Sequence, residues 1–171
     1  MNQIIQTLVQ HQAFQHVPQE DVLRMVEKCT IRVYQVGELI CKQGEEANCA
    51  LLLIQGKLDV LVSNHQEQFF VGTIFPGEVF GEHGLFLHSV RNAHVFAKTK
   101  SICMQIFPHV LKEEVHNPAT VALERHLLVS MARRLKNSAH KRVHPILPSK
   151  GMYLGFLHFC AKIVDYVRNL G

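Results

Sequence analysis

The pattern of apolar and polar positions divides the chain into a helical beginning, a β-rich middle and a helical end. Before residue 30, apolar residues recur at helical spacing over 4–8 and again over 22–26, and Pro18 separates the two sets. Glu20 and Asp21 open the second set, where acidic side chains suit the positive end of a helix dipole. We therefore expect two short helices ahead of the β-rich part.

Between residues 30 and 107 the apolar positions come in short runs that end at turn residues. Residues 51–54 form a continuous apolar run, and the polar stretch 63–67 is typical of a hairpin tip. Short strands with turn signals about every eight to twelve residues predict an all-β sandwich, barrel or roll. The pattern alone does not choose among these three.

Helical spacing returns after Pro108. A long helix is expected from Thr120 to about Arg142, because one apolar stripe recurs every seven residues: Val121, Leu128 and Leu135, with Met131 between them. Such a stripe is compatible with two arrangements. It can form the seam of a homodimer through the helix at 120–142, or it can pack the helix on its own domain. One stripe over two to three turns favours the second reading.

The end of the chain is expected to form a linker and one more helix. Residues 144–150 contain two prolines, so we divide the chain into a first domain at 1–143, a linker at 144–150 and an apolar helix at 151–171. Lys162 and Asp165 interrupt that helix, so the sequence predicts no membrane span.

Composition narrows the class of protein. A chain of 171 residues with 47% hydrophobic content predicts one ordinary globular domain with a small appendage. The net charge is +4, and much of the basic excess lies in 133–142, where a solvated helix face is favoured over a nucleic-acid or lipid surface. The five cysteines form no C-x-x-C pair, and the first ten residues lack a secretory pattern, so we expect a cytoplasmic protein with reduced thiols.

Candidate chemistry gathers in residues 75–97. Pro76 and the Gly-Glu pairs that follow it, the second being Gly81-Glu82, predict a turn, and residues 84–87 are long enough for one helical turn whose amino end can hold an anion. Arg91 offers a guanidinium for phosphate oxygens, and Glu82 offers a carboxylate for sugar hydroxyls. Together they predict a site for a small sugar phosphate.

Phe80-Gly81-Glu82, an apolar run and then Arg91-Asn92-Ala93 resemble the phosphate-binding cassette of cyclic nucleotide-binding domains. That family includes the bacterial catabolite activator protein and the regulatory subunits of cyclic-nucleotide-dependent kinases. Three further segments resemble its motifs in the same order, at 36–45, 51–60 and 131–135. The resemblance covers residues 14–142. It implies a mainly β fold with flanking helices: a jelly-roll-like antiparallel β-roll at about 30–107, N-terminal helices and a long C-terminal helix at about 119–142.

The resemblance also implies a set of ligand-binding positions: Gly81, Glu82, His83, Gly84, Arg91, Asn92, Ala93 and Ser138. Glu82 accepts from the ribose 2′-hydroxyl, Arg91 binds the phosphate, and Ser138 reaches the base, with Asn137 as the alternate. Residues 131–135 match the bacterial activators, which favours cAMP over cGMP. Asn92 departs from the usual Ser, Thr or Ala, and because it both donates and accepts it leaves adenine and guanine open. His83 departs from the usual apolar residue.

The function implied by the resemblance is a regulatory sensor that couples cyclic nucleotide binding to movement of its C-terminal helices. Its effector protein is not identified by the sequence. The alternative is a ligand-free structural or interaction module that docks through those helices. We expect no enzyme activity and no metal, because hydrolase and P-loop signatures and zinc-ligand spacing are absent from the sequence. Specific DNA binding is not expected, because only one helix fits after Pro148.

Overall fold

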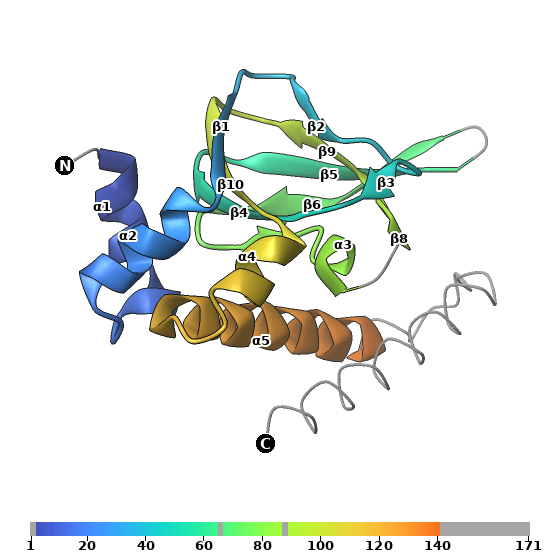
Figure 1. The fold of residues 1–171 in the computed structure, drawn as a ribbon. Helices are drawn as coiled ribbons and strands as arrows, with labels where there is room; N and C mark the ends of the chain where they lie inside the picture. Colours follow the sequence, from blue (N-terminus) through green and yellow to red (C-terminus); the bar gives the residue numbers. More distant parts are fainter. Residues whose placement is uncertain (1–2, 65–66, 87–88, 141–171) are drawn as a thin grey trace. The chain divides into compact units, whose positions relative to one another are not determined.

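The computed structural model describes residues 3–64, 67–86 and 89–140, with side chains up to residue 134 (Figure 1). The chain forms two compact units, residues 1–133 and 134–171, and the fold described below is that of the first unit. The expected linker at 144–150 and the expected helix at 151–171 lie outside the described residues.

Three helical segments precede the sheets: α1 at Gln3–Val9, the 3-10 helix η1 at Gln12–Phe14 and α2 at Gln19–Glu27. α2 begins directly after Pro18 with acidic residues in its first turn, as the sequence pattern predicts. Leu8, Phe14 and Met25 are each at most 1% exposed. They belong to the apolar cluster that joins the helices to the first sheet.

Ten short strands of the described residues form an antiparallel β-roll (Figure 1). The first sheet has the order β1-β10-β4-β7, at Thr30–Tyr34, Ser101–Ile106, Ala50–Gln55 and Val79–Phe80. The second has the order β2-β9-β5-β6, at Leu39–Cys41, His94–Ala97, Leu58–Ser63 and Gln68–Ile74. A two-stranded ribbon pairs β3 at Glu46–Ala47 with β8 at Ser89–Val90. All these pairings are antiparallel, which confirms the predicted fold class.

β4 separates two apolar clusters, which explains why its sequence shows no alternation. Residues 50–54 are all buried. Leu51 and Leu53 face the interior of the roll together with Cys41 and Cys103, whereas Leu52 belongs to the cluster under the helices. A strand covered on both faces reads as a continuous apolar run.

Two helices follow the last strand, α4 at Pro108–Glu113 and α5 at Pro118–His140. α5 begins two residues before the expected Thr120. Asn117 Oδ1 accepts from the Ala119 N–H at 2.8 Å, and Pro118 suits a first helical turn, so this segment makes a good helix start. The Asn117 side chain also donates to the Asp21 carbonyl at 3.1 Å, which ties the beginning of α5 to α2.

The face of α5 that packs on the roll differs from the predicted seven-residue stripe. Leu123, Leu127 and Met131 are buried, at most 4% exposed. Val121 is 52% exposed and Leu128 is half-buried, and the side chain of Leu135 lies outside the described residues. The stripe at 121 and 128 is therefore a second apolar face.

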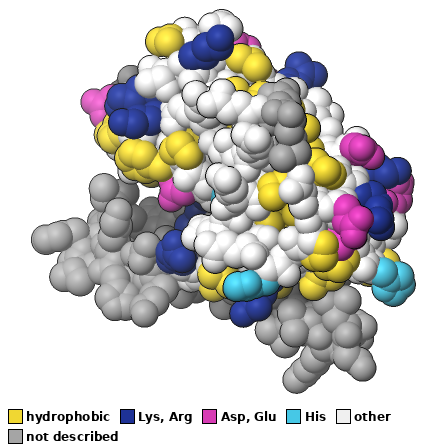
Figure 2. All heavy atoms as spheres, turned by 90° about the vertical axis from the view of Figure 1, so that its left-hand side faces the viewer, with side chains coloured by type: hydrophobic (Ala, Val, Ile, Leu, Met, Phe, Trp, Pro, Cys, Tyr) yellow, Lys and Arg dark blue, Asp and Glu magenta, His cyan; other side chains and the backbone are white. Residues whose placement is uncertain are grey.

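Several features bear on the class of protein. No described helix is both long and apolar enough to cross a membrane. Within the described ranges, no three His, Cys, Asp or Glu side chains gather as metal ligands would, and Cys29, Cys41, Cys49 and Cys103 are free thiols. On the face that carries α1 and α2, basic and acidic side chains are interspersed (Figure 2).

Candidate functional site

The candidate site begins where the chain leaves the first sheet. β7 pairs with β4, and Gly81 follows it with a φ of +68°. That left-handed conformation favours glycine and turns the chain into α3 at His83–Phe86. The Gly84 N–H donates to the Gly81 carbonyl at 3.1 Å and the Leu85 N–H to the Glu82 carbonyl at 3.0 Å. The predicted turn is therefore present, and the helical turn expected at 84–87 begins one residue earlier, at His83.

Arg91 reaches across this turn and contacts two backbone carbonyls. Its own backbone is fixed on both sides, because its N–H donates to Glu45 O at 2.7 Å and its C=O accepts from Gly44 N–H at 2.9 Å. Nη1 donates to Cys49 O at 2.9 Å and to Gly81 O at 3.1 Å. Nη2 lies 3.4 Å from Cys49 Sγ. The guanidinium is thus held at the amino end of α3.

The two glycines of the cassette leave space that side chains would fill. A Cβ on Gly81 would collide with Arg91 Nη1, so this glycine lets the guanidinium approach the turn. A Cβ on Gly84 would lie 2.8 Å from the carbonyl carbon and oxygen of Ala47 in β3. α3 therefore packs directly against the backbone of the β3–β8 ribbon.

Glu82 directly precedes α3, and His83 is the first residue of that helix. Glu82 is only 3% exposed, and buried carboxylates in proteins are nearly always paired. His83 is half-buried and begins the helix. The carboxylate of Glu82 and the guanidinium of Arg91 thus belong to residues that flank the same glycine turn.

The remaining predicted site residues are less enclosed. Asn92 is exposed and Ala93 is half-buried, and both lie between Arg91 and β9. Ser138 and its alternate Asn137 are helical residues of α5, but their side chains lie outside the described ones. The structure thus brings Arg91 into contact with the Gly81 turn that precedes Glu82 and His83, whereas the side chain of Ser138 is not described.

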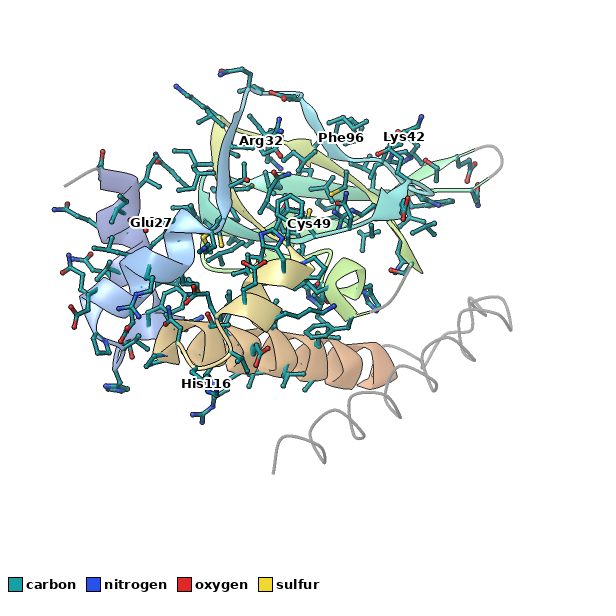
Figure 3. The ribbon with its side chains drawn as sticks, viewed as in Figure 1. Glu27, Arg32, Lys42, Cys49, Phe96 and His116 are labelled. Atoms are coloured by element: carbon teal, nitrogen blue, oxygen red, sulfur yellow. The ribbon has the colours of Figure 1, made fainter. Side chains whose placement is uncertain are left out.

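Sequence reasoning missed Cys49, which contacts the Arg91 guanidinium through both its carbonyl oxygen and its Sγ. Cys49 is 3% exposed and lies inside the roll (Figure 3). Cys41 lies near the same guanidinium: burial raises the pKa of its thiol to about 11, although Arg91 acts in the opposite direction. The one sequence signal is the set of small residues Ala47, Cys49 and Ala50 around the beginning of β4, which permits close packing.

The arrangement combines three features that suit a phosphorylated sugar. A guanidinium forms two-point hydrogen bonds with phosphate oxygens, the amino end of a helix favours negative charge, and a carboxylate accepts from hydroxyl groups. Here Glu82 and α3 follow the Gly81 turn directly, and Arg91 contacts the same turn from a later segment of the chain.

Comparison with known proteins agrees with this geometry. The profile of the cyclic nucleotide-binding domain matches residues 31–117, a range that contains the site from Gly81 to Ala93. Human (Homo sapiens) cGMP-dependent protein kinase 2 is 28% identical over 94 residues, which cover 53% of this chain and 12% of the kinase. The cAMP-activated global transcriptional regulator CRP of Pasteurella multocida is 28% identical over 144 residues, 83% of this chain and 64% of the regulator. The chain thus spans less than two thirds of each relative.

Solved structures show the same fold. The catabolite activator protein of Thermus thermophilus superposes with a TM-score of 0.65 and 23% identity, over 75% of this chain and 60% of that protein. The family profile covers just over half of the chain and includes every predicted site residue except Ser138. The chain belongs to the cyclic nucleotide-binding domain family.

Proposed function

We propose that this protein is a regulatory sensor that binds a cyclic purine nucleotide, with cAMP preferred to cGMP. The observation that carries the proposal is the Arg91 guanidinium, whose Nη1 lies 3.1 Å from the Gly81 carbonyl at the amino end of α3. In this position it can bind the cyclic phosphate through charge-assisted hydrogen bonds.

The neighbouring residues fit the rest of such a ligand. We assign Glu82 to the ribose 2′-hydroxyl, and the backbone of His83 and Gly84 to the phosphate beside Arg91. Asn92 and Ala93 follow the arginine in the sequence, and we assign them to the edge of the same site. We assign the base to Ser138 of α5. The preference for cAMP rests on the sequence of residues 131–135 and is supported by the similarity to a cAMP-activated regulator.

Coupling to a partner is the second part of the proposal. Leu85 and Phe86 of α3 pack against the same apolar cluster that contains Leu123 and Leu127 of α5. A ligand that fixes α3 therefore changes the packing available to α5, and the helix reports binding to an effector protein. We propose a non-catalytic role in a reducing compartment such as the cytoplasm, which the four free thiols among the described residues support. The exposed Val121 side of α5 is a candidate homodimer seam.

Isothermal titration calorimetry with cAMP, cGMP and 5′-AMP tests the proposal. We expect a micromolar Kd for the cyclic nucleotides, about −8 kcal/mol, with cAMP bound more tightly than cGMP and 5′-AMP bound weakest. Arg91→Ala removes a charge-assisted pair and should weaken binding by about 2–5 kcal/mol. Arg32→Ala is the matched control, because Arg32 (labelled in Figure 3) is exposed on β1, away from the cassette sequence.

Thermal unfolding of both variants verifies that they fold. If Arg91→Ala binds as tightly as the wild type, the assignment of the phosphate site is wrong. If the folded wild type binds none of the three nucleotides, the ligand-free interaction module that docks through its C-terminal helices becomes the better reading.

A further inference from the structure

Outside the candidate site, two histidines from distant parts of the sequence contact one backbone carbonyl. His11 Nε2 lies 3.2 Å from Gly77 O, and His126 Nε2 lies 3.3 Å from the same oxygen. Their rings meet edge to face with centroids 5.1 Å apart. His11 caps η1, His126 belongs to α5, and Gly77 lies in the turn between β6 and β7. Three separate segments of the first unit therefore meet at this carbonyl.

Hydrogen bonding fixes the protonation state of His11. The Ala13 N–H donates to His11 Nδ1 at 3.2 Å, so Nδ1 carries no proton. The neutral ring then carries its proton on Nε2, which donates to the Gly77 carbonyl. A second proton can enter only at Nδ1, where it breaks the cap of η1. The arrangement therefore requires a neutral His11.

The surroundings of the two histidines also oppose the positive charge that protonation of either ring would create. Burial lowers the pKa of both histidines, and each is raised in part by the Gly77 carbonyl. His126 further lowers the pKa of His11, and Arg133 of α5 lowers that of His126. A cleft of about 460 Å³, lined by Gln10, His11, Gln12, Pro76 and Gly77 among others, opens beside His11 and gives protons access.

The shared carbonyl lies close along the chain to the cassette. The Gly77 N–H donates to the Leu53 carbonyl at 2.8 Å, and the Leu53 N–H donates to the Glu78 carbonyl at 3.0 Å, so the turn is fixed to β4. A Cβ on Gly77 would lie 3.2 Å from His11 Nε2, which shows how closely the ring approaches this turn. Gly81 and its contact with Arg91 follow four residues later.

We propose that His11 and His126 are positioning residues of the nucleotide site, which fix the N-terminal segment and α5 to the turn before the cassette and release them on acidification. This proposal rests on the proposed function. A ligand that binds the fixed arrangement better than the released one selects it, so protonation of the pair lowers the apparent affinity.

The sign follows from proton binding. The released histidines have ordinary pKa values near 6.5, and the fixed pair has lowered ones, so release takes up protons. The tie, meaning the pair of contacts of His11 and His126 with the Gly77 carbonyl, is fully formed above about pH 6.5. It is lost as the pH falls through the lowered pKa values of the two fixed histidines. Affinity for the nucleotide should therefore fall on acidification from pH 7.5 to pH 5.0.

Calorimetry with cAMP at pH 7.5 and pH 5.0 tests the tie in the full chain. We expect wild type to lose affinity by about two- to tenfold at the lower pH, the range of one neutral hydrogen bond. His126→Gln retains a donor for Gly77 O without a titrating group and should show a smaller loss. His11→Asn retains an acceptor for the Ala13 N–H but does not reach Gly77. It should bind about two- to tenfold more weakly at pH 7.5 and show a smaller further loss at pH 5.0 than wild type, because only His126 then titrates.

The exposed His16, close to η1 in sequence, supplies the matched control. His16→Gln should retain the wild-type affinity at both pH values. A wild-type affinity that does not change between pH 7.5 and 5.0, or an equal effect of His16→Gln and His126→Gln, would overturn the proposal.

A ligand-free measurement separates this proposal from the proposed function. Hydrogen-exchange protection of the amides at 77–81, corrected for the intrinsic effect of pH, should fall on acidification in wild type and less in His126→Gln. If this protection falls while no nucleotide binds at any pH, the tie is supported. The assignment of the nucleotide site is then wrong, and so is the proposed effect of the tie on nucleotide affinity. If protection is unchanged, the tie is wrong whatever the binding data show.

Discussion

Gly84 lies so close to the β3–β8 ribbon that one added methyl group must displace backbone. A Cβ there would lie 2.8 Å from the Ala47 carbonyl carbon and oxygen and 3.0 Å from its Cβ. We predict that Gly84→Ala lowers the free energy of unfolding by about 1–3 kcal/mol, as overpacking does elsewhere. Urea unfolding measures the change, and nucleotide binding should weaken with it because α3 shifts.

Gly72 of β6 is the control for this substitution. A Cβ on Gly72 would have no heavy atom within 4 Å, so Gly72→Ala should change the free energy of unfolding by no more than about 0.5 kcal/mol. Equal effects of the two substitutions would mean that the contact of α3 with β3 does not determine stability at position 84.

The buried thiols make stability depend on alkaline pH. Burial raises the pKa of Cys41 from 9.0 to about 11 and those of Cys29 and Cys103 from 9.0 to about 12. Above pH 9 the unfolded chain loses these protons while the folded chain retains them. The free energy of unfolding should therefore fall between pH 8 and pH 10, by at most about 1.4 kcal/mol per pH unit for each thiol.

Urea unfolding at the two pH values measures this fall, and Cys103→Ala should reduce it. Cys103 is the suited position because its pKa is raised chiefly by burial, with Cys41 as the lesser cause. A free energy of unfolding that stays constant up to pH 10 would contradict the assignment of these thiols to the core.

At the scale of single elements, α5 offers two neighbouring leucines with different surroundings. Leu127 is fully buried in the cluster under the first sheet, and Leu128 is half-buried. Leu127→Ala should lower the free energy of unfolding by about 2–5 kcal/mol, the usual effect of a core cavity. Leu128→Ala should have a much smaller effect, measured by the same urea titration.

The oligomeric state gives the complementary readout. If Leu128→Ala instead destabilises the protein as much as Leu127→Ala and makes its unfolding midpoint depend on concentration, the second face of α5 is a homodimer seam. Equal effects without concentration dependence would mean that the buried face of α5 has been misassigned.

This helix also shows where sequence reasoning succeeds and where it fails. The long apolar repeat predicts the existence of α5 and its buried Met131, but Val121 and Leu128 do not lie on the buried face, which Leu123 and Leu127 form instead. Periodicity identifies a helix, whereas the face that packs depends on the tertiary neighbours. The two-residue strands β3 and β8 were not predicted, because two residues carry no periodicity.

The candidate site likewise contains residues that local sequence spacing predicts and contacts that it does not predict. The positions of Gly81, Glu82 and Arg91 could be inferred from their local spacing, and the structure places them around one turn. Cys49 could not, because its contact with Arg91 joins residues 42 positions apart. The convergence of His11 and His126 on Gly77 likewise exists only after folding.

For the first unit as a whole, ligand binding and stability are linked. A ligand that binds only the folded state raises the free energy of unfolding by about 2.7 kcal/mol at one hundred times its Kd. The effect should appear with cAMP in wild type and should be strongly reduced in Arg91→Ala, which lacks the guanidinium that contacts the Gly81 turn in wild type.

The same linkage should extend from the cassette to α5. Phe86 of α3 packs against the cluster that contains Leu123 and Leu127, so fixing α3 should restrict α5. We predict that cAMP increases hydrogen-exchange protection at residues 118–133 as well as at 81–86. Phe86→Ala should retain binding through Arg91 but lose most of the added protection of α5, because it removes part of the contact that joins the two helices. If cAMP protects 81–86 alone in wild type, or if Phe86→Ala leaves the protection of α5 intact, α5 does not report binding through this contact.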